Sequence, residues 1–457
     1  MTVRLDPGTA EVAYDDVPLG RFHLRVAAAS TGGVFSDGFG LGIIGTALAA
    51  SGGALTLTHA WTGLLGGASL AGLFVGALLT GPVADRFGRR RIFAYNMAAL
   101  AALSMLQYVV GSRAELLVLR LGIGFVLGTD YVVSKAMLTE FTPRRRRGAI
   151  LSLLSVAWAG GFACAFAIGV LLVDRGADAW RWMLVAGSVP CLLILPLRVT
   201  MPESPLWLVD HGQVARAREI VREKLGKGVG DPLRGPSPVV SASRWRQLFS
   251  RAWRRRTLVA CAFFTFQVIP YFAVGTFVAQ VLDALNVQGA RSGGLIYNGA
   301  LLIGAAAGLL VVDRLPRRVF LVGSFALAAA AMLLLTLVPG LPAVGTFTLF
   351  AIFALVLSAA SNLVYVYLPE LFPTDLRASG IGLAVAASRI GSAVGTFLLP
   401  ILVDSAGIHA ALGVCVATLL LGGAICYAWA PETRHSGLAL VSAAPHPSPD
   451  CTERRAN

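Results

Sequence analysis

Charged residues are scarce in this sequence. Asp, Glu, Lys and Arg make up 14% of its 457 residues, whereas 56% are hydrophobic and the mean hydropathy is +0.73. So few charges cannot cover the surface of a soluble globular protein of this length. The composition therefore excludes a soluble globular class and predicts a protein of the lipid bilayer.

The sequence also lacks the residue patterns of disulfide frameworks, metal sites and enzyme active sites. Its six cysteines include no CxxC pair and mostly lie in apolar runs, which predicts packing residues. The six histidines are scattered, and no nucleotide-binding loop, metal-ligand spacing or nucleophile constellation occurs. Residues 1–22 lack the features of a cleaved secretory signal. We therefore expect neither an enzyme nor a metal or organic cofactor.

The hydrophobic residues gather in twelve segments, and a helix needs ~20 mostly apolar residues to cross a bilayer. The predicted spans cover residues 23–50, 59–83, 92–111, 114–137, 148–173, 181–200, 256–285, 291–313, 318–338, 342–367, 378–403 and 408–430. We therefore predict an all-α membrane protein with twelve transmembrane helices.

Arginine and lysine are unevenly distributed among the loops that join these spans. They gather before span one, after spans two, four, six, eight and ten, and in the tail. The alternate loops hold only Arg113, Arg175, Arg181 and Arg291. Since short cytoplasmic loops retain an excess of basic residues, both termini are predicted to be cytoplasmic. The net charge of +14 then reflects membrane topology, and no nucleic-acid partner is expected.

The order of spans and loops predicts five parts of the chain. They are a cytoplasmic N-terminal tail at 1–22, an N-terminal six-helix bundle at 23–200, a cytoplasmic loop with amphipathic helices at 201–255, a C-terminal six-helix bundle at 256–430 and a disordered cytoplasmic tail at 431–457.

The loop between the bundles has three predicted segments. Residues 204–226 are expected to form an amphipathic helix, with Ser204 and Pro205 as its start signals. Gly226 marks its end. A linker rich in Gly, Pro and Ser follows at 227–243. The run SRWRQLFSRAWRRR after it is typical of an interfacial helix on anionic headgroups.

Three charged motifs each occur twice. After span two stands GPVADRFGRRR and after span eight DRLPRR, which places Asp85 and Asp313 228 residues apart. After spans four and ten, an acid is followed by proline and then arginine at the same spacing, with Glu140 and Glu370 230 residues apart. Spans six and twelve end in PESP and PETR, 229 residues apart. These offsets indicate that the second half of the chain repeats the first.

These motifs supply candidate residues for a conformational latch. A carboxylate at one helix end can pair with the arginine fork of a neighbouring helix in a directional contact, and such a pair can hold one of two states. The alternative is that the charges only anchor helix ends at the headgroups. The candidate latch residues are Asp85, Arg86, Gly88, Arg89, Arg90, Glu140, Arg147, Asp313, Arg314, Glu370 and Arg377.

The doubled motifs resemble those of the major facilitator superfamily. The DRxGRR loop, the E-x-x-P-x-x-x-R element in both halves, and the PESP and PET endings are most similar to those of sugar porters and their metabolite/proton symporter relatives. The resemblance extends over roughly residues 20–435. It implies two six-helix bundles related by a pseudo-two-fold axis, a central cavity and alternating access.

Ionisable residues inside the spans are candidates for proton coupling, because a charge at bilayer depth costs about 2.5–3.5 kcal/mol. The candidates are Asp37 in span one and Arg120 and Asp130 in span four. The resemblance to sugar porters implies that Asp37 pairs with Arg120 when deprotonated and releases it when protonated. Related symporters have a second acid where this chain has Gly40, so Asp37 acts alone or Asp130 shares the role. A purely structural role for Asp37 stays open.

Polar and aromatic residues of both halves are predicted to line the cavity. The candidate substrate-binding residues are Tyr131, Lys135, Trp158, Gln267, Tyr271, Asn298, Asn362, Tyr365 and Arg389. Lys135 either attracts an anionic substrate or pairs with Glu140, and Pro270 is expected to break its helix near Gln267. Trp158 stands where the similar phosphate symporters have glutamine, which disfavours phosphate. The doubled glutamines that sugar porters use for hexoses are absent.

Together these features predict a monomeric secondary transporter of a bacterial inner membrane. The leading hypothesis is symport of protons with a small polar metabolite, such as an organic or aromatic acid, a polyol or a sugar. A proton-coupled efflux antiporter is the first alternative, although span five lacks the Gly-Pro-Gly-Gly element of drug antiporters. A membrane sensor that has lost transport is the second.

Overall fold

The computed structural model describes residues 12–433, apart from 52, 227, 231–245 and 339. Nearly all regular structure in these residues is α-helical, and one isolated parallel β-bridge joins Val12 to Val229. Most of the predicted linker at 227–243 and of the predicted C-terminal tail lies outside the described residues.

Twelve helical segments of the described chain are long and apolar enough to cross a membrane, which confirms the number predicted. The helices of the first half are α1 (Arg21–Ala50), α2 (His59–Phe87), α3 (Arg89–Leu106), α4 (Arg113–Phe141), α5 (Arg144–Leu172), α6 (Ala179–Ala186) and α7 (Ser188–Val199). Those of the second half are α11 (Arg254–Thr276), α12 (Val278–Ala284), α13 (Ala290–Val311), α14 (Arg317–Leu337), α15 (Ala343–Ala360), α16 (Leu363–Glu370), α17 (Thr374–Ala406) and α18 (Ile408–Trp429).

Three of the predicted spans are divided between two helices. The chain is interrupted at Gly187 between α6 and α7, at Phe277 between α11 and α12, and at Ser361 and Asn362 between α15 and α16. The predicted break at Pro270 is wrong, because α11 runs through Pro270 and ends near Phe277. Proline inside a transmembrane helix is tolerated where neighbouring groups satisfy the freed backbone.

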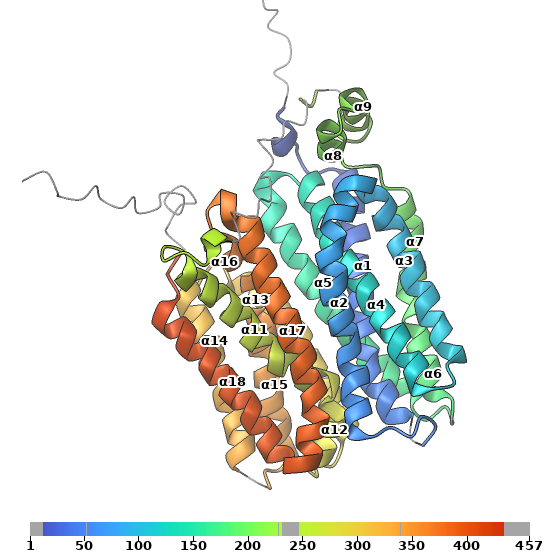
Figure 1. The fold of residues 1–457 in the computed structure, drawn as a ribbon, viewed down its shortest axis with the longest axis vertical. Coiled ribbons are helices and arrows are strands. Elements are labelled where there is room, and N and C mark those ends of the chain that lie inside the picture. Colours follow the sequence, from blue (N-terminus) through green and yellow to red (C-terminus); the bar gives the residue numbers. More distant parts are fainter. Residues whose placement is uncertain (1–11, 52, 227, 231–245, 339, 434–457) are drawn as a thin grey trace, which may run out of the picture.

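The helices form two bundles that stand side by side (Figure 1), with α1–α7 in one and α11–α18 in the other. Within the first bundle α2 packs on α4 and α1 on α5; within the second, α13 packs on α15 and α11 on α17. Between the bundles, α2 packs on α17 and α5 on α13. The helices α1, α2, α4 and α5 of the first half thus correspond to α11, α13, α15 and α17 of the second, and equivalent helices make equivalent contacts. The predicted repeat of six-helix bundles is therefore confirmed.

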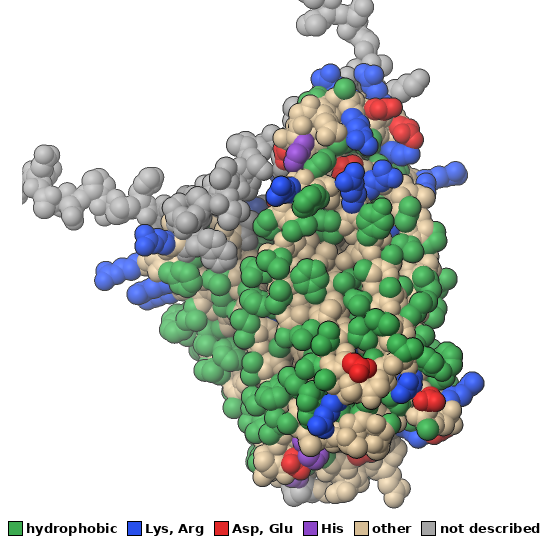
Figure 2. Space-filling model, turned by 45° about the vertical axis from the view of Figure 1, so that its right-hand side comes forward, with side chains coloured by type: hydrophobic (Ala, Val, Ile, Leu, Met, Phe, Trp, Pro, Cys, Tyr) green, Lys and Arg blue, Asp and Glu red, His purple; other side chains and the backbone are tan. Residues whose placement is uncertain are grey.

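The lateral surface of the molecule is hydrophobic. Figure 2 shows hydrophobic side chains in a broad band across the face in view, with charged side chains gathered towards its two ends. Large apolar residues point outward along the band, including Leu193, which is 77% exposed, and Val344, which is 76% exposed. Apolar exposure on this scale indicates a surface covered by lipid rather than water.

Both halves of the described chain begin and end at one face, which we call the terminus face. α1 begins there and α18 ends there, and two short helices of the loop between the bundles, α8 (Pro205–Asp210) and α9 (Val214–Lys224), lie beyond it (Figure 1). The opposite face carries α12 and the connection between α1 and α2.

The prediction of one amphipathic helix over 204–226 is wrong, since α8 and α9 are separate. A turn divides them, with Gly212 at a φ of +74°. The predicted start is confirmed: Ser204 Oγ accepts a hydrogen bond from the Trp207 amide at 3.2 Å, and Pro205 occupies the first turn. Of the predicted interfacial helix, residues 246–248 are helical and residues 249–253 form a bend and turns before α11 begins, while residues 243–245 lie outside the described residues.

Candidate functional site

A cavity lies between the two bundles and takes its lining from both. Eight of the predicted substrate and coupling residues face it, namely Asp37, Tyr131, Lys135, Trp158, Gln267, Tyr271, Tyr365 and Arg389. Its volume is about 100 Å³, below the ~300 Å³ at which pockets for drug-sized ligands begin. The described conformation therefore leaves room for only a small solute.

Close helix packing sets the shape of this cavity. Gly38 of α1 faces α5 so closely that a Cβ at Gly38 would lie 2.1 Å from the Trp158 carbonyl oxygen. The Trp158 indole then packs against rings of the other bundle, 5.9 Å from Tyr271 and 5.6 Å from Phe272 between ring centroids. The aromatic wall of the cavity is thus continuous across the two halves.

Two cationic side chains reach the cavity from opposite bundles. Lys135 Nζ of α4 lies 3.4 Å from the ring centroid of Tyr131 and 4.7 Å from that of Tyr365. The Arg389 guanidinium of α17 lies 5.2 Å from the Tyr131 ring and 5.6 Å from the Phe264 ring. Among the described residues, neither cation has a carboxylate within ion-pair distance. The alternative that Lys135 pairs with Glu140 is wrong, because Glu140 pairs with Arg89.

Only some neutral polar groups of the cavity have partners. Gln267 Nε2 donates to the Leu357 carbonyl at 2.9 Å, and its Oε1 has no partner. The Ser155 and Ser361 hydroxyls lie 3.1 Å apart, and Ser361 also donates to the Ser358 carbonyl at 2.6 Å. The Ser358 hydroxyl, which also faces the cavity, has no partner, so the lining keeps free hydrogen-bonding groups besides its charges.

A fully buried ion pair lies beside Asp37. Arg198, in the last turn of α7, pairs with Asp130 of α4, and both side chains are 0% exposed. Arg198 Nη2 also donates to Ser134 Oγ at 2.9 Å, and Asn96 Nδ2 donates to Asp130 at 3.3 Å. Asp37 is 5% exposed, and its Oδ1 has no hydrogen-bond partner.

The expected Asp37–Arg120 ion pair is absent among the described residues. Both terminal nitrogens of Arg120 donate to the Gly40 carbonyl instead, at 3.1 and 3.0 Å. Gly40 is the position where related symporters carry a second acid. The Gly40 backbone oxygen thus takes the place of Asp37 as the partner of Arg120, and the arginine that pairs with the other predicted coupling acid, Asp130, is Arg198.

Two predicted substrate residues lie outside the cavity lining. Asn298 is 1% exposed and donates to the Gly294 carbonyl at 2.8 Å within its own helix. Asn362 is fully buried and donates to the Ala305 carbonyl at 3.1 Å, which ties α13 to the interruption before α16. Both amides donate to backbone carbonyls in the buried interior, which is the packing alternative to substrate contact.

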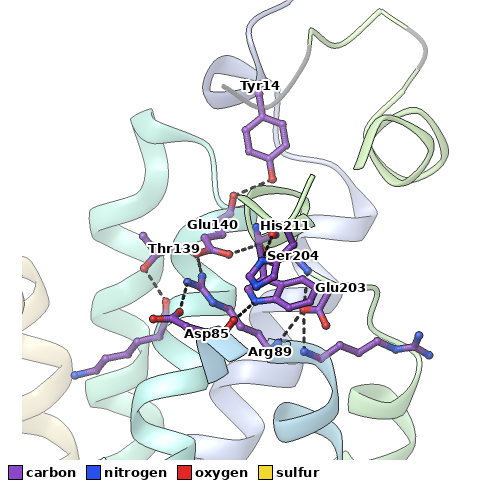
Figure 3. A network of polar contacts seen from close by, with 11 residues as sticks. Tyr14, Asp85, Arg89, Thr139, Glu140, Glu203, Ser204 and His211 are labelled. Atoms are coloured by element: carbon purple, nitrogen blue, oxygen red, sulfur yellow. Dashed lines mark hydrogen bonds and ion pairs between the residues drawn. The ribbon is translucent and has the colours of Figure 1, made fainter. Parts of the chain in front are cut away.

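The doubled motifs form a charge network at the terminus face of the first bundle (Figure 3). Arg89 pairs with Glu140 of α4 and lies 3.6 Å from Asp85. Glu203 accepts hydrogen bonds from the amides of Arg89 and Arg90, each at 3.0 Å, and so caps α3. Ser204 donates to Glu140. Gly88, at a φ of +91°, is required here, because a Cβ would lie 2.5 Å from Glu203 Oε2.

The second bundle repeats this network. Arg317 lies 3.5 Å from Glu370 and 3.4 Å from Asp313. Glu432 accepts from the amides of Arg317 and Arg318 at 2.9 and 3.0 Å and caps α14, and Thr433 donates to Glu370. We name these two sets the N-latch (Asp85, Arg89, Glu140, Glu203, Ser204) and the C-latch (Asp313, Arg317, Glu370, Glu432, Thr433). Each holds helices of its own bundle together.

The other predicted latch residues make looser contacts. The Arg86 side chain is exposed and lies 5.4 Å over the Phe87 ring, Arg314 is exposed, and Arg377 donates to the Pro369 carbonyl at 3.1 Å.

Arg147, in contrast, pairs with Asp15 of the segment before α1, at 2.7 Å. The segment that carries Asp15 also places the Tyr14 hydroxyl 3.0 Å from the Glu140 carbonyl, and burial raises the pKa of Tyr14, so the hydroxyl stays a donor at neutral pH.

Sequence reasoning missed several residues of these networks. Arg198, Glu203, Ser204, Arg317, Glu432 and Thr433 were not predicted as site residues. The doubled PESP and PET endings were a signal for four of them, since a repeated acid and hydroxyl after each bundle suggests a shared role. The signal for Arg198 was an arginine inside the apolar end of span six. No group of three or more His, Cys, Asp or Glu side chains that could hold a metal ion occurs in the described part of the chain.

Contacts at the opposite face join the two bundles. A Cβ at Gly63 of α2 would lie 2.1 Å from the Phe397 carbonyl of α17. Arg291 of α13 makes a bidentate ion pair with Asp174, at 3.0 and 3.2 Å, and His59 lies 3.1 Å from Asp404. The bundles are therefore closed against each other on this side of the cavity.

Comparison with known proteins places the chain among transport proteins. The family model described as sugar (and other) transporter matches residues 26–444. The inner membrane metabolite transport protein YgcS of Escherichia coli K12 is 38% identical, over 95% of this chain and 97% of that protein. The putative metabolite transport protein YaaU of the same organism is 37% identical, over 94% and 96%. The E. coli xylose transporter XylE in a partially occluded inward open conformation is similar in structure, with a TM-score of 0.76, 18% identity, and coverage of 92% of this chain and 100% of that one.

Proposed function

The chain belongs to the sugar (and other) transporter family of the major facilitator superfamily, and on that premise we propose that it is a proton-coupled symporter of a small polar metabolite. It moves its substrate across the inner membrane by alternating access. The relatives named as metabolite transport proteins, which it matches over nearly its whole length, support this reading over the sensor alternative.

The observation that carries the proposal is a cavity lined by both bundles and closed at one face. The α2–α17 contact at Gly63 and the Arg291–Asp174 pair close the opposite face. The cavity itself lies between the halves. Rocking of one bundle against the other about such a site exposes it to each side of the membrane in turn.

Proton coupling in this proposal rests on Asp37 and its neighbour Asp130. Asp37 lines the cavity, and Asp130 is held by Arg198 in the interior of the first bundle. A proton on Asp37 lets the two carboxyl groups hydrogen-bond, and its loss places two negative charges beside one arginine. Protonation thus changes the balance of charge next to the substrate, which is what symport requires.

The orientation and partners follow from the same proposal. The terminus face, with its basic loops, is the cytoplasmic side. The protein acts as a monomer in the lipid bilayer, and the proton gradient is its driving force, with no metal, organic cofactor or nucleic acid involved. An antiporter that exports its substrate remains the competing mechanism within the family.

Uptake by proteoliposomes tests the proposal. Purified protein is reconstituted and offered a panel of radiolabelled acids, sugars and polyols, with and without an inward proton gradient. We expect one class of these solutes to accumulate inside the proteoliposomes only when the proton gradient is present. Accumulation that ignores the gradient would rule out symport, and accumulation driven by an outward gradient would favour the antiporter.

A further inference from the structure

The substrate class can be narrowed from the lining of the cavity. Resting on the proposed transport function, we propose that the substrate is a small aromatic carboxylate, bound as an anion. Its carboxylate lies between Lys135 and Arg389, and its ring lies against the aromatic wall around Trp158.

The first argument is the charge of the cavity. Lys135 and Arg389 come from different bundles and approach the same ring, that of Tyr131. Arg389 is only 7% exposed, and its Nε has no hydrogen-bond partner. Buried cations without a counter-ion are costly and normally pair with an acid, yet the described residues supply none within ion-pair distance. An anionic ligand is the missing partner, and a carboxylate matches the guanidinium fork.

The second argument is the aromatic content of the lining. Six rings face the cavity, from Tyr131, Trp158, Phe264, Tyr271, Phe272 and Tyr365. Trp158 has tilted and edge-on neighbours in Tyr271 and Phe272, with interplanar angles of 43° and 80°. Such a wall gains most from a flat ring, because aromatic pairs favour offset-stacked and edge-to-face arrangements.

Because the arginine and the lysine belong to opposite bundles, the ligand has a second role. Its carboxylate neutralises two like charges that repel each other when the halves approach. Binding should therefore favour the closed arrangement of the bundles over the open one, as a substrate must if it is to promote the transport step.

A binding measurement on the purified full-length protein tests this class directly. Thermal stabilisation in detergent, which reports the affinity of a ligand for the folded state, is recorded with benzoate and nicotinate, with their neutral amides benzamide and nicotinamide, with cyclohexanecarboxylate and with xylose. We expect both aromatic acids to bind at least tenfold more tightly than their amides. Cyclohexanecarboxylate, which keeps the charge but not the flat ring, should fall between them.

Variants locate the binding site. Lys135→Gln and Arg389→Gln should each weaken benzoate binding at least tenfold, and Arg389→Lys should recover part of the loss. Arg175→Gln removes an exposed arginine at the opposite face and should leave binding unchanged. Benzamide that binds as well as benzoate to the wild-type protein would overturn the proposal, and so would two glutamine variants with wild-type affinity.

Reconstituted protein separates this inference from the proposed function. Exchange of labelled xylose but not of nicotinate would overturn the aromatic acid while transport stands. Specific binding of aromatic acids by protein that exchanges no solute would overturn transport while the ligand class stands. Exchange of nicotinate that is blocked by benzoate and not by benzamide would support both.

Discussion

At the scale of single residues, the Asp130–Arg198 pair dominates the interior of the first bundle. Arg198 bonds Asp130 and Ser134 and also donates to the carbonyls of Ala29 and Phe93, at 3.0 and 3.3 Å. It thereby links α7 to α1, α3 and α4. A buried pair of this kind contributes little compared with an apolar substitute, but the loss of one partner leaves an uncompensated charge.

The first prediction concerns this pair. Arg198→Met should destabilise the protein by about 3–5 kcal/mol, because Asp130 stays buried without its cation. The double variant Asp130→Asn with Arg198→Met should lose less stability than Arg198→Met alone. The stabilities of the purified variants are compared by heating each protein and measuring the fraction that stays folded by size-exclusion chromatography. A double variant less stable than Arg198→Met alone would contradict this prediction.

A second prediction at this scale concerns Asp37. Asn at this position keeps the shape and a donor towards Asp130 but cannot exchange a proton. Asp37→Asn should therefore abolish uphill uptake while sparing exchange of substrate at equal concentrations on both sides. Both are measured in proteoliposomes with the same labelled substrate. Unchanged uphill uptake would remove Asp37 from the coupling role.

At the scale of elements, the two latches join the end of one transmembrane helix to the start of another. Glu203 and Glu432 each cap the helix that follows the arginine-rich loop, where a carboxylate also complements the helix dipole. Arg89 and Arg317 each reach an acid at the end of the fourth span of their bundle. Because the arrangement is the same twice, it explains why three motifs recur at one offset along the chain.

The latch arginines have strong and weak partners, which leads to a third prediction. Glu140 is 9% exposed in its pair with Arg89, whereas Asp85 is 72% exposed. Glu140→Gln should destabilise the protein by about 3–5 kcal/mol, and Asp85→Asn by less than ~1 kcal/mol. Apparent melting temperatures in detergent distinguish the two, with Glu370→Gln as the matched change in the C-latch. Equal losses of stability from Asp85→Asn and Glu140→Gln would contradict the inference that the buried partner of Arg89 stabilises the protein more than the exposed one.

The sequence predicts features that lie along the chain better than contacts between residues that are far apart in the chain. Apolar runs and repeated loop motifs lie along the chain, so the twelve spans and the latch acids Glu140 and Glu370 could be predicted. The partner of Asp130 could not, because Arg198 is 68 residues away and nothing in its own span identifies an acid. The expected Asp37–Arg120 pair came from resemblance, and it failed where this chain departs from the family pattern at Gly40.

At the scale of the whole molecule, contacts between the bundles are unevenly distributed. At the opposite face two exposed ion pairs and the close approach at Gly63 join the halves. The latches of the terminus face stay within their own bundles. The exposed ion pairs are worth only ~0–1 kcal/mol each, so the close packing of α2 on α17 is the larger contribution to closure at the opposite face.

This difference supports the last prediction, that a larger side chain at Gly63 opens the opposite face. A leucine there cannot fit 2.1 Å from the Phe397 carbonyl, so α2 and α17 must separate. In Gly63→Leu, distances between spin labels on the two bundles should lengthen at the opposite face and shorten at the terminus face. Gly323→Leu, where an added Cβ meets nothing within 4 Å, is the matched control. Since the bundles move as units about the cavity, unchanged distances in Gly63→Leu would mean that α2 yields locally and that Gly63 does not control which side is open.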